Sequence, residues 1–301
     1  MPRPLLHGLV VGTFGRHYLV ELTDPESTGP ETLTCVTRGK RSMLACGDHV
    51  EIARTGPGQG VIEAVDPRST LLYRSDQFRQ KLIAANVTQI VIVLAVVPSF
   101  YEELLNRCIA AAEHQRLSLV IVLNKADLAG ESTSAMDRLT LYSDLGYRVV
   151  PLSAKRDVSP LRPVLAGQVS ALVGQSGMGK STIINALIPG AAAATAEFST
   201  ALDSGRHTTT HARLYHLDTN SALIDSPGMQ EFGLHHLTSL DLAEAFVEFR
   251  PLLGHCRFQN CRHLVEPGCA LAPPDSTAPV NARRLDAYRK LVREIDSGRK
   301  F

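Results

Sequence analysis

The sequence has no long apolar run and no excess of charge of either sign. Its longest apolar stretch, Ile90 to Val97, has eight residues, far fewer than the roughly 20 that a membrane-spanning helix requires. Residues Met1 to Pro4 are not followed by an apolar signal segment. We therefore expect a cytoplasmic protein with no membrane partner.

The balance of charge gives no global signal for nucleic-acid binding. The formal net charge is +1, with 31 Lys and Arg against 30 Asp and Glu, so any contact with RNA or DNA has to depend on local patches. At 301 residues, of which 44% are apolar, the chain is long enough for two or three domains with real cores.

Residues 1–72 predict a small all-β barrel. Short β-like runs alternate with turn sequences, and no helical period appears before residue 75. The five runs are Gly8–Phe14, His17–Leu22, Thr32–Thr37, His49–Ala53 and Gly60–Val65. An OB-type or SH3-like barrel fits this pattern. Such a barrel either binds RNA, which Arg38, Lys40 and Arg41 mildly favour, or is a plain structural module.

From Asn86 the pattern changes to alternating strands and helices. An apolar run, Gln89–Val97, is followed by an amphipathic helix, Tyr101–His114, and by a second apolar run, Ser118–Leu123. Helix-like and strand-like segments continue to Val150. This alternation predicts a mostly parallel sheet, in which ligands bind beyond the carboxyl ends of the strands.

A phosphate-binding loop is predicted at Gly174–Ser181, which has the spacing G-x-x-x-x-G-K-S. It follows the apolar run Val169–Val173 and precedes a helix-like segment, Thr182–Leu187. In this motif backbone N–H groups surround phosphate oxygens, while Lys180 reaches the terminal phosphates and the Ser181 hydroxyl reaches Mg²⁺. The alternative is a glycine-rich turn, which the flanking strand and helix disfavour.

Specificity for guanine is predicted from Asn124-Lys125-Ala126-Asp127, directly after an apolar run. The Asp127 carboxylate can accept hydrogen bonds from guanine N1–H and the 2-amino group, which adenine does not offer in that form. Adenine would leave this acceptor unpaired, at a cost of about 1–3 kcal/mol. We expect Asn124 to fix the loop and reach the base, and the stem of Lys125 to cover it. Taken alone, the tetrapeptide could be a polar turn.

Two further short segments fit a guanine-nucleotide protein. Ser153-Ala154-Lys155 follows the next apolar strand, Tyr147–Pro151, where such proteins support the base with a main-chain N–H. Asp225-Ser226-Pro227-Gly228 follows the apolar run Ala222–Ile224. There a carboxylate holds Mg²⁺ through water, and the glycine N–H faces the γ-phosphate.

A switch threonine is predicted in residues 205–210, Gly-Arg-His-Thr-Thr-Thr, between the phosphate loop and Asp225. Such a threonine closes on Mg²⁺ and the γ-phosphate when GTP is bound, and releases them after hydrolysis. We favour Thr209 over Thr208 for this role. The alternative is an exposed polar loop.

The order of these motifs indicates a circularly permuted GTPase. Ordinary GTPases begin with the phosphate loop and end with Asn-Lys-x-Asp and Ser-Ala-Lys, whereas this chain begins with the last two. The same sheet forms if the old termini are joined and new ones opened in a loop. The expected Mg²⁺ ligands are Ser181, Thr209 and Asp225. The expected nucleotide-binding residues are Asn124, Lys125, Asp127, Ser153, Ala154, Lys155, Gly174, Gln175, Ser176, Gly177, Met178, Gly179, Lys180, Ser181, Thr182, Asp225 and Gly228.

A structural zinc site is predicted from Cys256-x4-Cys261-x-His263-x5-Cys269. Three thiolates and one imidazole complete a tetrahedral shell and leave no position open for catalysis, so folding of this segment should depend on the ion. His255 is a competing imidazole, and its adjacency to Cys256 makes it the poorer ligand. The scattered Cys35, Cys46 and Cys108 are expected to be small buried side chains.

With these motifs the sequence resembles the ribosome small subunit-dependent GTPase A family, bacterial permuted GTPases of late small-subunit maturation. The resemblance covers nearly the whole chain and also rests on Glu231-Phe232-Gly233-Leu234. It implies an OB-fold barrel that binds RNA or the ribosome in residues 1–72, and a permuted α/β GTPase domain in residues 73–235. Residues 236–301 would form a mainly α-helical zinc-binding domain with a basic helix at its end.

The same resemblance implies cofactors and partners. GTP hydrolysis would be stimulated by the small (30S) ribosomal subunit and its 16S rRNA, and contact with other assembly factors is left open. One structural Zn²⁺ per chain and Mg²⁺ with GTP or GDP are the expected cofactors. We expect a monomer.

One position departs from many GTPases, which place a water-orienting Gln directly after Asp-x-x-Gly. Here that residue is Met229, and Gln230 is one position off. A thioether cannot position water, so unstimulated hydrolysis should be slow. The resemblance points to His207 as the group that orients water once the ribosome orders the loop. Its alternative is a solvent-exposed loop histidine. The expected catalytic residues are Lys180, His207 and Thr209.

The end of the chain predicts a basic amphipathic helix over Asn281–Glu294. Its Lys and Arg residues either form a solvated face or contact RNA phosphates. They are Arg283, Arg284, Arg289, Lys290 and Arg293.

The whole sequence therefore predicts a GTPase that acts on the small ribosomal subunit. One alternative is a nucleotide-gated RNA-binding scaffold with negligible turnover, which Met229 keeps open. A second is a zinc-dependent nucleic-acid regulator that binds DNA independently of GTP.

Overall fold

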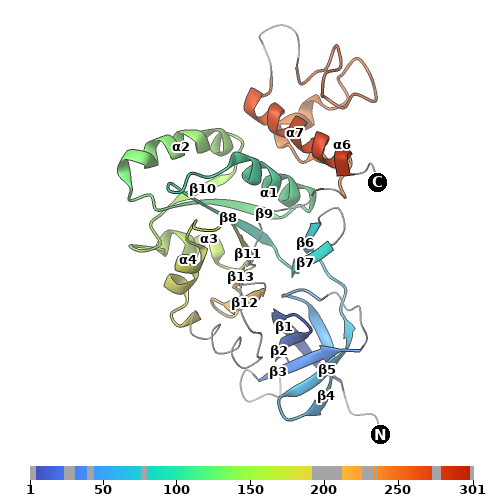
Figure 1. Ribbon diagram of the computed structural model, residues 1–301, viewed down its shortest axis with the longest axis vertical. Coiled ribbons are helices and arrows are strands. Elements are labelled where there is room, and N and C mark those ends of the chain that lie inside the picture. The colour runs from blue at the N-terminus through green and yellow to red at the C-terminus, as the bar shows by residue number, and fades with distance from the viewer. Residues whose placement is uncertain are drawn as a thin grey trace.

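The computed structural model shows a barrel, an α/β layer and a helical C-terminal module, in that order along the chain (Figure 1). The structure describes residues 5–23, 31–38, 44–75, 80–191, 212–225, 234, 236–272 and 279–298. Within these ranges no helix combines the length and apolar character needed to cross a bilayer. The three parts match the fold classes predicted from the sequence.

The N-terminal barrel contains the five strands expected from its turn sequences. They are β1 (Leu6–Phe14), β2 (His17–Leu22), β3 (Thr32–Thr37), β4 (His49–Gly56) and β5 (Gln59–Val65). The strand order is β1-β2-β3-β5-β4, and β4 pairs with β1 to close the barrel. The β3–β5 pairing is parallel and the others are antiparallel. Val10, Val20 and Ile52 are fully buried inside, as the alternation of side chains along a strand requires. This is the expected OB-type arrangement.

The central sheet is mostly parallel, as the alternation of strands and helices predicts. Its strands are β8 (Gln89–Ala95), β9 (Ser118–Asn124), β10 (Arg148–Pro151), β11 (Val169–Val173), β12 (Arg213–His216) and β13 (Ala222–Asp225). Their order is β10-β9-β8-β11-β13-β12, with β12 antiparallel to β13. The first two motif-bearing strands along the chain, β9 and β10, lie at one edge of this sheet.

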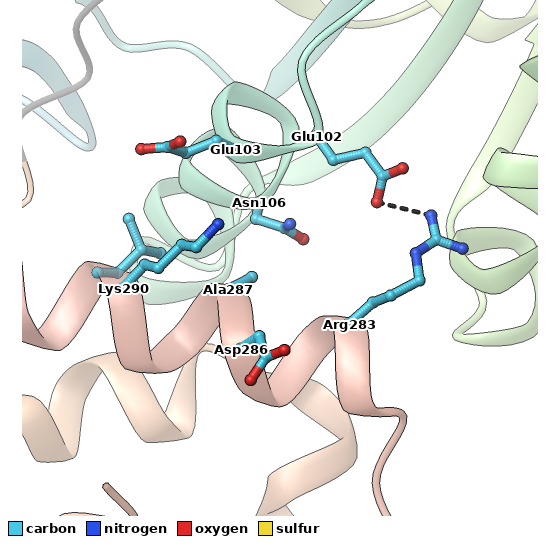
Figure 2. Close-up of a pocket in the computed structure, with 8 residues that line it drawn as sticks. Glu102, Glu103, Asn106, Arg283, Asp286, Ala287 and Lys290 are labelled. Atoms are coloured by element: carbon cyan, nitrogen blue, oxygen red, sulfur yellow. Dashed lines mark hydrogen bonds and ion pairs between the residues drawn. The ribbon is translucent and has the colours of Figure 1, made fainter.

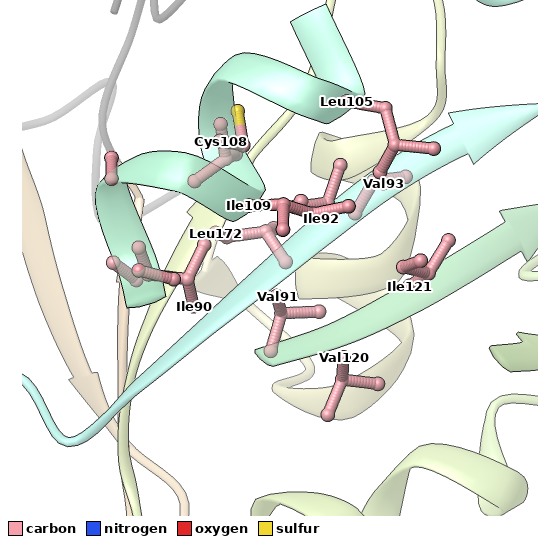
Figure 3. Packing of buried hydrophobic residues seen from close by; sticks show 14 of the residues in the cluster. Ile90, Val91, Ile92, Val93, Leu105, Cys108, Ile109, Val120, Ile121 and Leu172 are labelled. Carbon is pink, nitrogen blue, oxygen red and sulfur yellow. The ribbon is translucent and has the colours of Figure 1, made fainter. Parts of the chain in front are cut away.

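Helices cover both faces of this sheet, with α1 and α2 on one side and α3 and α4 on the other (Figure 1). They are α1 (Glu102–His114), α2 (Ala129–Asp144), α3 (Arg162–Leu165), which follows the short 3₁₀ turn η1 (Ser159–Leu161), and α4 (Lys180–Leu187). Every residue of β8 is buried, and Leu105, Cys108 and Ile109 of α1 pack over it (Figure 3). A strand covered on both faces has no solvent side, which explains the apolar sequence from Ile90 to Ala95, and the buried Gln89 is hydrogen-bonded to Val164 and Ser170.

A hairpin of β6 (Leu71–Ser75) and β7 (Gln80–Ala85) was not expected from the sequence. The four residues that connect the two strands contain no Gly or Pro, so the usual turn signal is missing. The hairpin lies between the barrel and the α/β layer (Figure 1).

The barrel is hydrogen-bonded to the α/β layer. Strand β1 pairs with β12, with Gly12 opposite Arg213, and the Thr13 N–H donates to the Ala212 carbonyl at 3.1 Å. Gly47 lies against β7, where a Cβ would be 2.2 Å from the Ala85 carbonyl oxygen, and its φ is +94°. A side chain at this position would separate the two parts.

The C-terminal module contains α6 (Ser239–Glu244), the 3₁₀ helix η2 (Val247–Leu252) and α7 (Ala282–Gly298). Its buried apolar side chains, such as Phe246, Leu285 and Leu291, belong to the same core cluster as those of α1, and charged groups add specific contacts. Arg284 of α7 is 1% exposed, pairs with Glu248 at 2.6 Å, donates to Asn106 of α1, and lies 4.2 Å from the Phe246 ring. Arg283 bonds Glu102 of α1 at 2.6 Å (Figure 2).

The basic helix is therefore partly used inside the protein. Besides Arg283 and Arg284, Arg289 donates to the His263 carbonyl at 3.1 Å. Neither a solvated face nor RNA phosphates account for these three residues. A sequence pattern shows that a charge is present, but its partner depends on how the helix is docked.

Replacing Arg284 with Ala should lower the free energy of unfolding by about 3 kcal/mol, because Glu248 and Asn106 would lose a buried partner. Urea unfolding followed by tyrosine fluorescence checks this, since the chain has no Trp and Tyr142 lies beside Arg284. The matched change Arg283→Ala removes a pair whose arginine side chain is 45% exposed, and should cost less than about 1 kcal/mol. Equal losses in the two variants would contradict the role given to burial.

Candidate functional site

The sequence motifs meet at one edge of the central sheet. Strands β9, β10, β11 and β13 are parallel, so the loops that follow them lie at the same carboxyl edge. These loops hold Asn124, Ser153, Gly174 and Asp225 with their neighbours. Segments separated by up to about a hundred residues thus form one candidate pocket.

Asn124 joins three of the four loops. Its side chain is almost fully buried, and its Nδ2 donates to the Met178 carbonyl of the phosphate loop at 2.9 Å. Its Oδ1 accepts from the Lys125 N–H at 2.8 Å and from the Ala154 N–H at 2.9 Å. The side-chain amide is therefore occupied in holding the loops together.

The phosphate loop approaches Asn124 so closely that it requires glycine. At Gly179 the φ is +93°, and a Cβ would lie 2.2 Å from Asn124 Nδ2. At Gly174 a Cβ would lie 2.3 Å from the Val93 carbonyl oxygen. The two outer glycines of the motif are thus needed for packing of the loop against β8 and β9, in addition to any contact with phosphate.

Two lysines donate to carbonyl groups of the phosphate loop. Lys180 Nζ lies 2.6 Å from the Gly174 oxygen and 3.0 Å from the Gln175 oxygen, and Lys125 Nζ lies 2.9 Å from the Gly177 oxygen. Burial lowers the pKa of Lys180, and the Asp225 carboxylate opposes this shift. An anion in the loop would offer Lys180 a better partner than neutral carbonyls.

The two candidate carboxylates lie in different environments. Asp225, at the end of β13, is half-buried, and desolvation raises its pKa against the opposing charge of Lys180. Asp127 lies on the surface side of its loop, where the Ser153 hydroxyl holds its pKa below the usual range, with Arg156 and Lys155 adding to the effect. Asp127 therefore remains an ionised acceptor, which recognition of guanine requires.

The structure describes some of the remaining residues expected in the pocket and leaves others outside its described ranges. Gln175 and Thr182 are half-buried, Ser176 and Ser181 are exposed, and Met178 is buried under the loop. The segments 205–210 and 226–233 lie outside the described residues, so the structure does not place His207, Thr208, Thr209, Gly228 or Met229.

A second candidate site lies in the C-terminal module, where Cys256, Cys261, His263 and Cys269 converge with all ligand atoms within 4.8 Å of one another. The three sulfur atoms lie 3.5, 3.6 and 3.4 Å from His263 Nδ1. Metal bonds of about 2.3 Å to sulfur and about 2.0 Å to nitrogen, at the tetrahedral angle, give a separation of about 3.5 Å. The cage fits a tetrahedral ion. Burial lowers the pKa of His263, which favours the neutral, metal-binding imidazole.

Sequence reasoning missed the carboxylate that shapes this cage. Glu266 accepts backbone N–H groups of Arg262, Leu264 and Val265 at 2.8–3.0 Å, and so fixes the turn that presents His263 at a φ of +61°. An acidic residue three positions after a ligand histidine is the only sequence signal, and it is a weak one.

Comparison with known proteins identifies the family. The sequence profile described as RsgA GTPase matches residues 65–235, more than half of the chain. A protein of Nitrosospira multiformis called "Small ribosomal subunit biogenesis GTPase RsgA" is 58% identical over 98% of this chain and 93% of its own length. The chain belongs to the RsgA GTPase family. As a member of it, the protein is a GTP hydrolase.

Other relatives agree with this assignment. A Nitrosomonas europaea protein of the same name is 53% identical over 96% of this chain and 92% of its own. The crystal structure of YjeQ from Thermotoga maritima superimposes with a TM-score of 0.73 at 28% identity, and covers 97% of this chain and 99% of its own. The structure of YloQ, described as a circularly permuted GTPase, has a TM-score of 0.71 at 22% identity, over 100% and 98%. The RsgA architecture thus extends along the whole chain.

Metal removal should expose three thiols and leave three others protected. With a thiol reagent and a strong chelator at neutral pH, Cys256, Cys261 and Cys269 should react, because the metal no longer binds them. Cys35, Cys46 and Cys108 are fully buried in the apolar cores, so these should react only after unfolding. Reaction of all six thiols together would contradict a separate metal-dependent module.

Proposed function

We propose that the chain hydrolyses GTP to GDP and phosphate while bound to the small (30S) ribosomal subunit, late in maturation of that subunit. The observation that carries the proposal is the set of Asn124 hydrogen bonds, which join the guanine-type loops to the phosphate loop. The names of the relatives, which describe biogenesis of the small ribosomal subunit, support the choice of partner. Family membership favours the hydrolase over both alternatives, the scaffold and the DNA regulator.

In the proposed pocket, the loop N–H groups of residues 174–182 and Lys180 hold the phosphates. Asp127 selects guanine, supported by Ala154 and by the Lys125 stem. Ser181, Thr209 and Asp225 hold Mg²⁺, and Gly228 faces the γ-phosphate. When GTP binds, Lys180 exchanges its two carbonyl partners in the loop for the γ-phosphate. It then neutralises the negative charge of this phosphate as hydrolysis proceeds.

In the C-terminal module we propose one structural Zn²⁺ held by Cys256, Cys261, His263 and Cys269. Sulfur-rich tetrahedral cages suit zinc, and four protein ligands leave no open position. The ion would join the turns around residues 256–269, which have little regular secondary structure of their own, and so stabilise the module.

The proposed division of the chain follows these roles. Residues 1–72 form an OB-fold barrel for the ribosome and its 16S rRNA, residues 73–235 the GTPase domain, and residues 236–301 the zinc-binding domain. The family match over residues 65–235 and the three parts of the fold support these limits. We further propose a cytoplasmic monomer, as expected for a factor that acts on ribosomal subunits.

Small ribosomal subunits should increase phosphate release from GTP by at least tenfold, because Met229 leaves the free protein without a water-orienting glutamine. Release of phosphate measured with and without purified subunits checks this. The Lys180→Ala variant should lose nearly all of the stimulated rate. An unstimulated wild-type protein would instead support a scaffold that holds GTP.

His207 is proposed to orient the attacking water on the subunit. His207→Ala should then lower the stimulated rate by about 10²–10⁴-fold, the range of general-base effects, while GTP affinity changes little. His207→Gln should retain part of the rate, because an amide can also orient water. A stimulated rate unchanged in His207→Ala would remove this role.

A further inference from the structure

The loop between the first two ligand cysteines presents an exposed aromatic side chain. Residues Arg257, Phe258, Gln259 and Asn260 are all exposed, and Phe258 is 42% accessible to solvent. The loop is short and ends on both sides in candidate metal ligands, and the Cys261 N–H donates to the Phe258 carbonyl at 3.2 Å. Phe258 is therefore held in an exposed position, although such side chains are usually buried.

Arg257 is fixed beside this ring by the opposite turn of the cage. Its N–H donates to the Gly268 carbonyl at 3.0 Å. Its aliphatic stem covers Gly268, where a Cβ would lie 2.9 Å from Arg257 Cβ and 3.3 Å from Cδ. The guanidinium carbon lies 5.5 Å from the centre of the Phe258 ring, within the range of a cation–π contact. A side chain at residue 268 would displace the arginine.

The positive charge of Arg257 has no acidic partner among the described residues. Several acids of the module have other partners: Glu248 pairs with Arg284, and Asp296 with Arg262. Glu294 pairs with Arg107 of α1, and Glu266 accepts three backbone N–H groups. The loop thus combines an uncompensated cation with an exposed aromatic face.

We propose that Arg257 and Phe258 bind an unpaired RNA base and its phosphate, with the base stacked on the ring. This inference rests on the proposed function, because it names the contact that the zinc module makes with ribosomal RNA. An unstacked base offers a π-face for Phe258, and its phosphate offers a charge for Arg257. A protein partner would favour a larger apolar patch, whereas the adjoining residues Gln259 and Asn260 are polar.

The position of the loop suits such a contact. In the view of Figure 1 the turns of the module lie on the side of α7 away from α1, and α7 packs against α1. RNA bound at the loop would therefore leave the nucleotide pocket open.

The test measures binding of the full-length protein to purified small ribosomal subunits, in the presence of a non-hydrolysable GTP analogue. Phe258→Ala should weaken binding about tenfold, as expected for the loss of one stacked base. Phe258→Leu should weaken binding similarly, because leucine keeps the apolar area but has no π-face. Phe258→Trp should bind like the wild type, because tryptophan keeps a π-face. The matched control is Val265→Ala, an apolar residue of the same module that is 85% exposed, and it should leave affinity unchanged.

Salt dependence separates the two side chains. Arg257→Ala should reduce the slope of log affinity against log salt by about one, the value for one phosphate contact. Phe258→Ala should leave this slope unchanged. A photoreactive phenylalanine analogue at residue 258 should cross-link to 16S rRNA. Metal content measured for each variant verifies that the cage is intact.

Three outcomes would overturn the inference. Phe258→Leu binding like wild type would indicate an apolar contact, as would a cross-link to a ribosomal protein. Unchanged affinity in Phe258→Ala would show that the loop does not bind the subunit. Failure of the proposed function is a separate result, because the wild-type protein would then neither bind subunits nor respond to them in GTP hydrolysis.

Discussion

The side-chain amide of Asn124 is the constraint on which the pocket depends. One buried amide donates to the phosphate loop and accepts from two loops of the guanine type. Such a group can be buried only if its hydrogen bonds are made, and breaking one costs more than making it gains. The three loops therefore have one relative arrangement, and Gly179 is glycine because Asn124 approaches it.

Circular permutation leaves the pocket itself unchanged, but it changes which parts of the chain lead from the pocket to the barrel and to the C-terminal module. Strand β12 follows the switch segment in sequence and pairs with β1 of the barrel, while the chain after Asp225 leads to the C-terminal module. That module rests on α1, the helix after β8, through the pairs of Arg283, Arg284 and Arg107. Both outer parts are thus attached to elements that border the phosphate loop or its switches.

The charged residues of α7 illustrate how charge in a sequence acquires its role. Arg284 and Arg293 look alike in the sequence, yet one is 1% exposed between Glu248 and Asn106 and the other lies in water. A buried guanidinium has to be paired, so it specifies how the helix docks. Exposed charges without partners, such as that of Arg257, are the ones available to an anionic partner.

The sequence by itself determined the permuted motif order, the strands of the barrel, the central sheet and the four candidate metal ligands. These depend on local spacing, on periodicity and on residue types that few other chemistries require. Only the tertiary structure decided that Asn124 joins the loops, that Glu266 shapes the metal cage, that β6 and β7 form a hairpin, and that Arg283, Arg284 and Arg289 of the basic helix bond within the protein. The reason is physical: the bonds that Asn124 and Arg284 make to other elements join residues 30 to 178 positions apart. Such a bond leaves no periodic trace in either segment, and it exists only once folding has brought the two residues together.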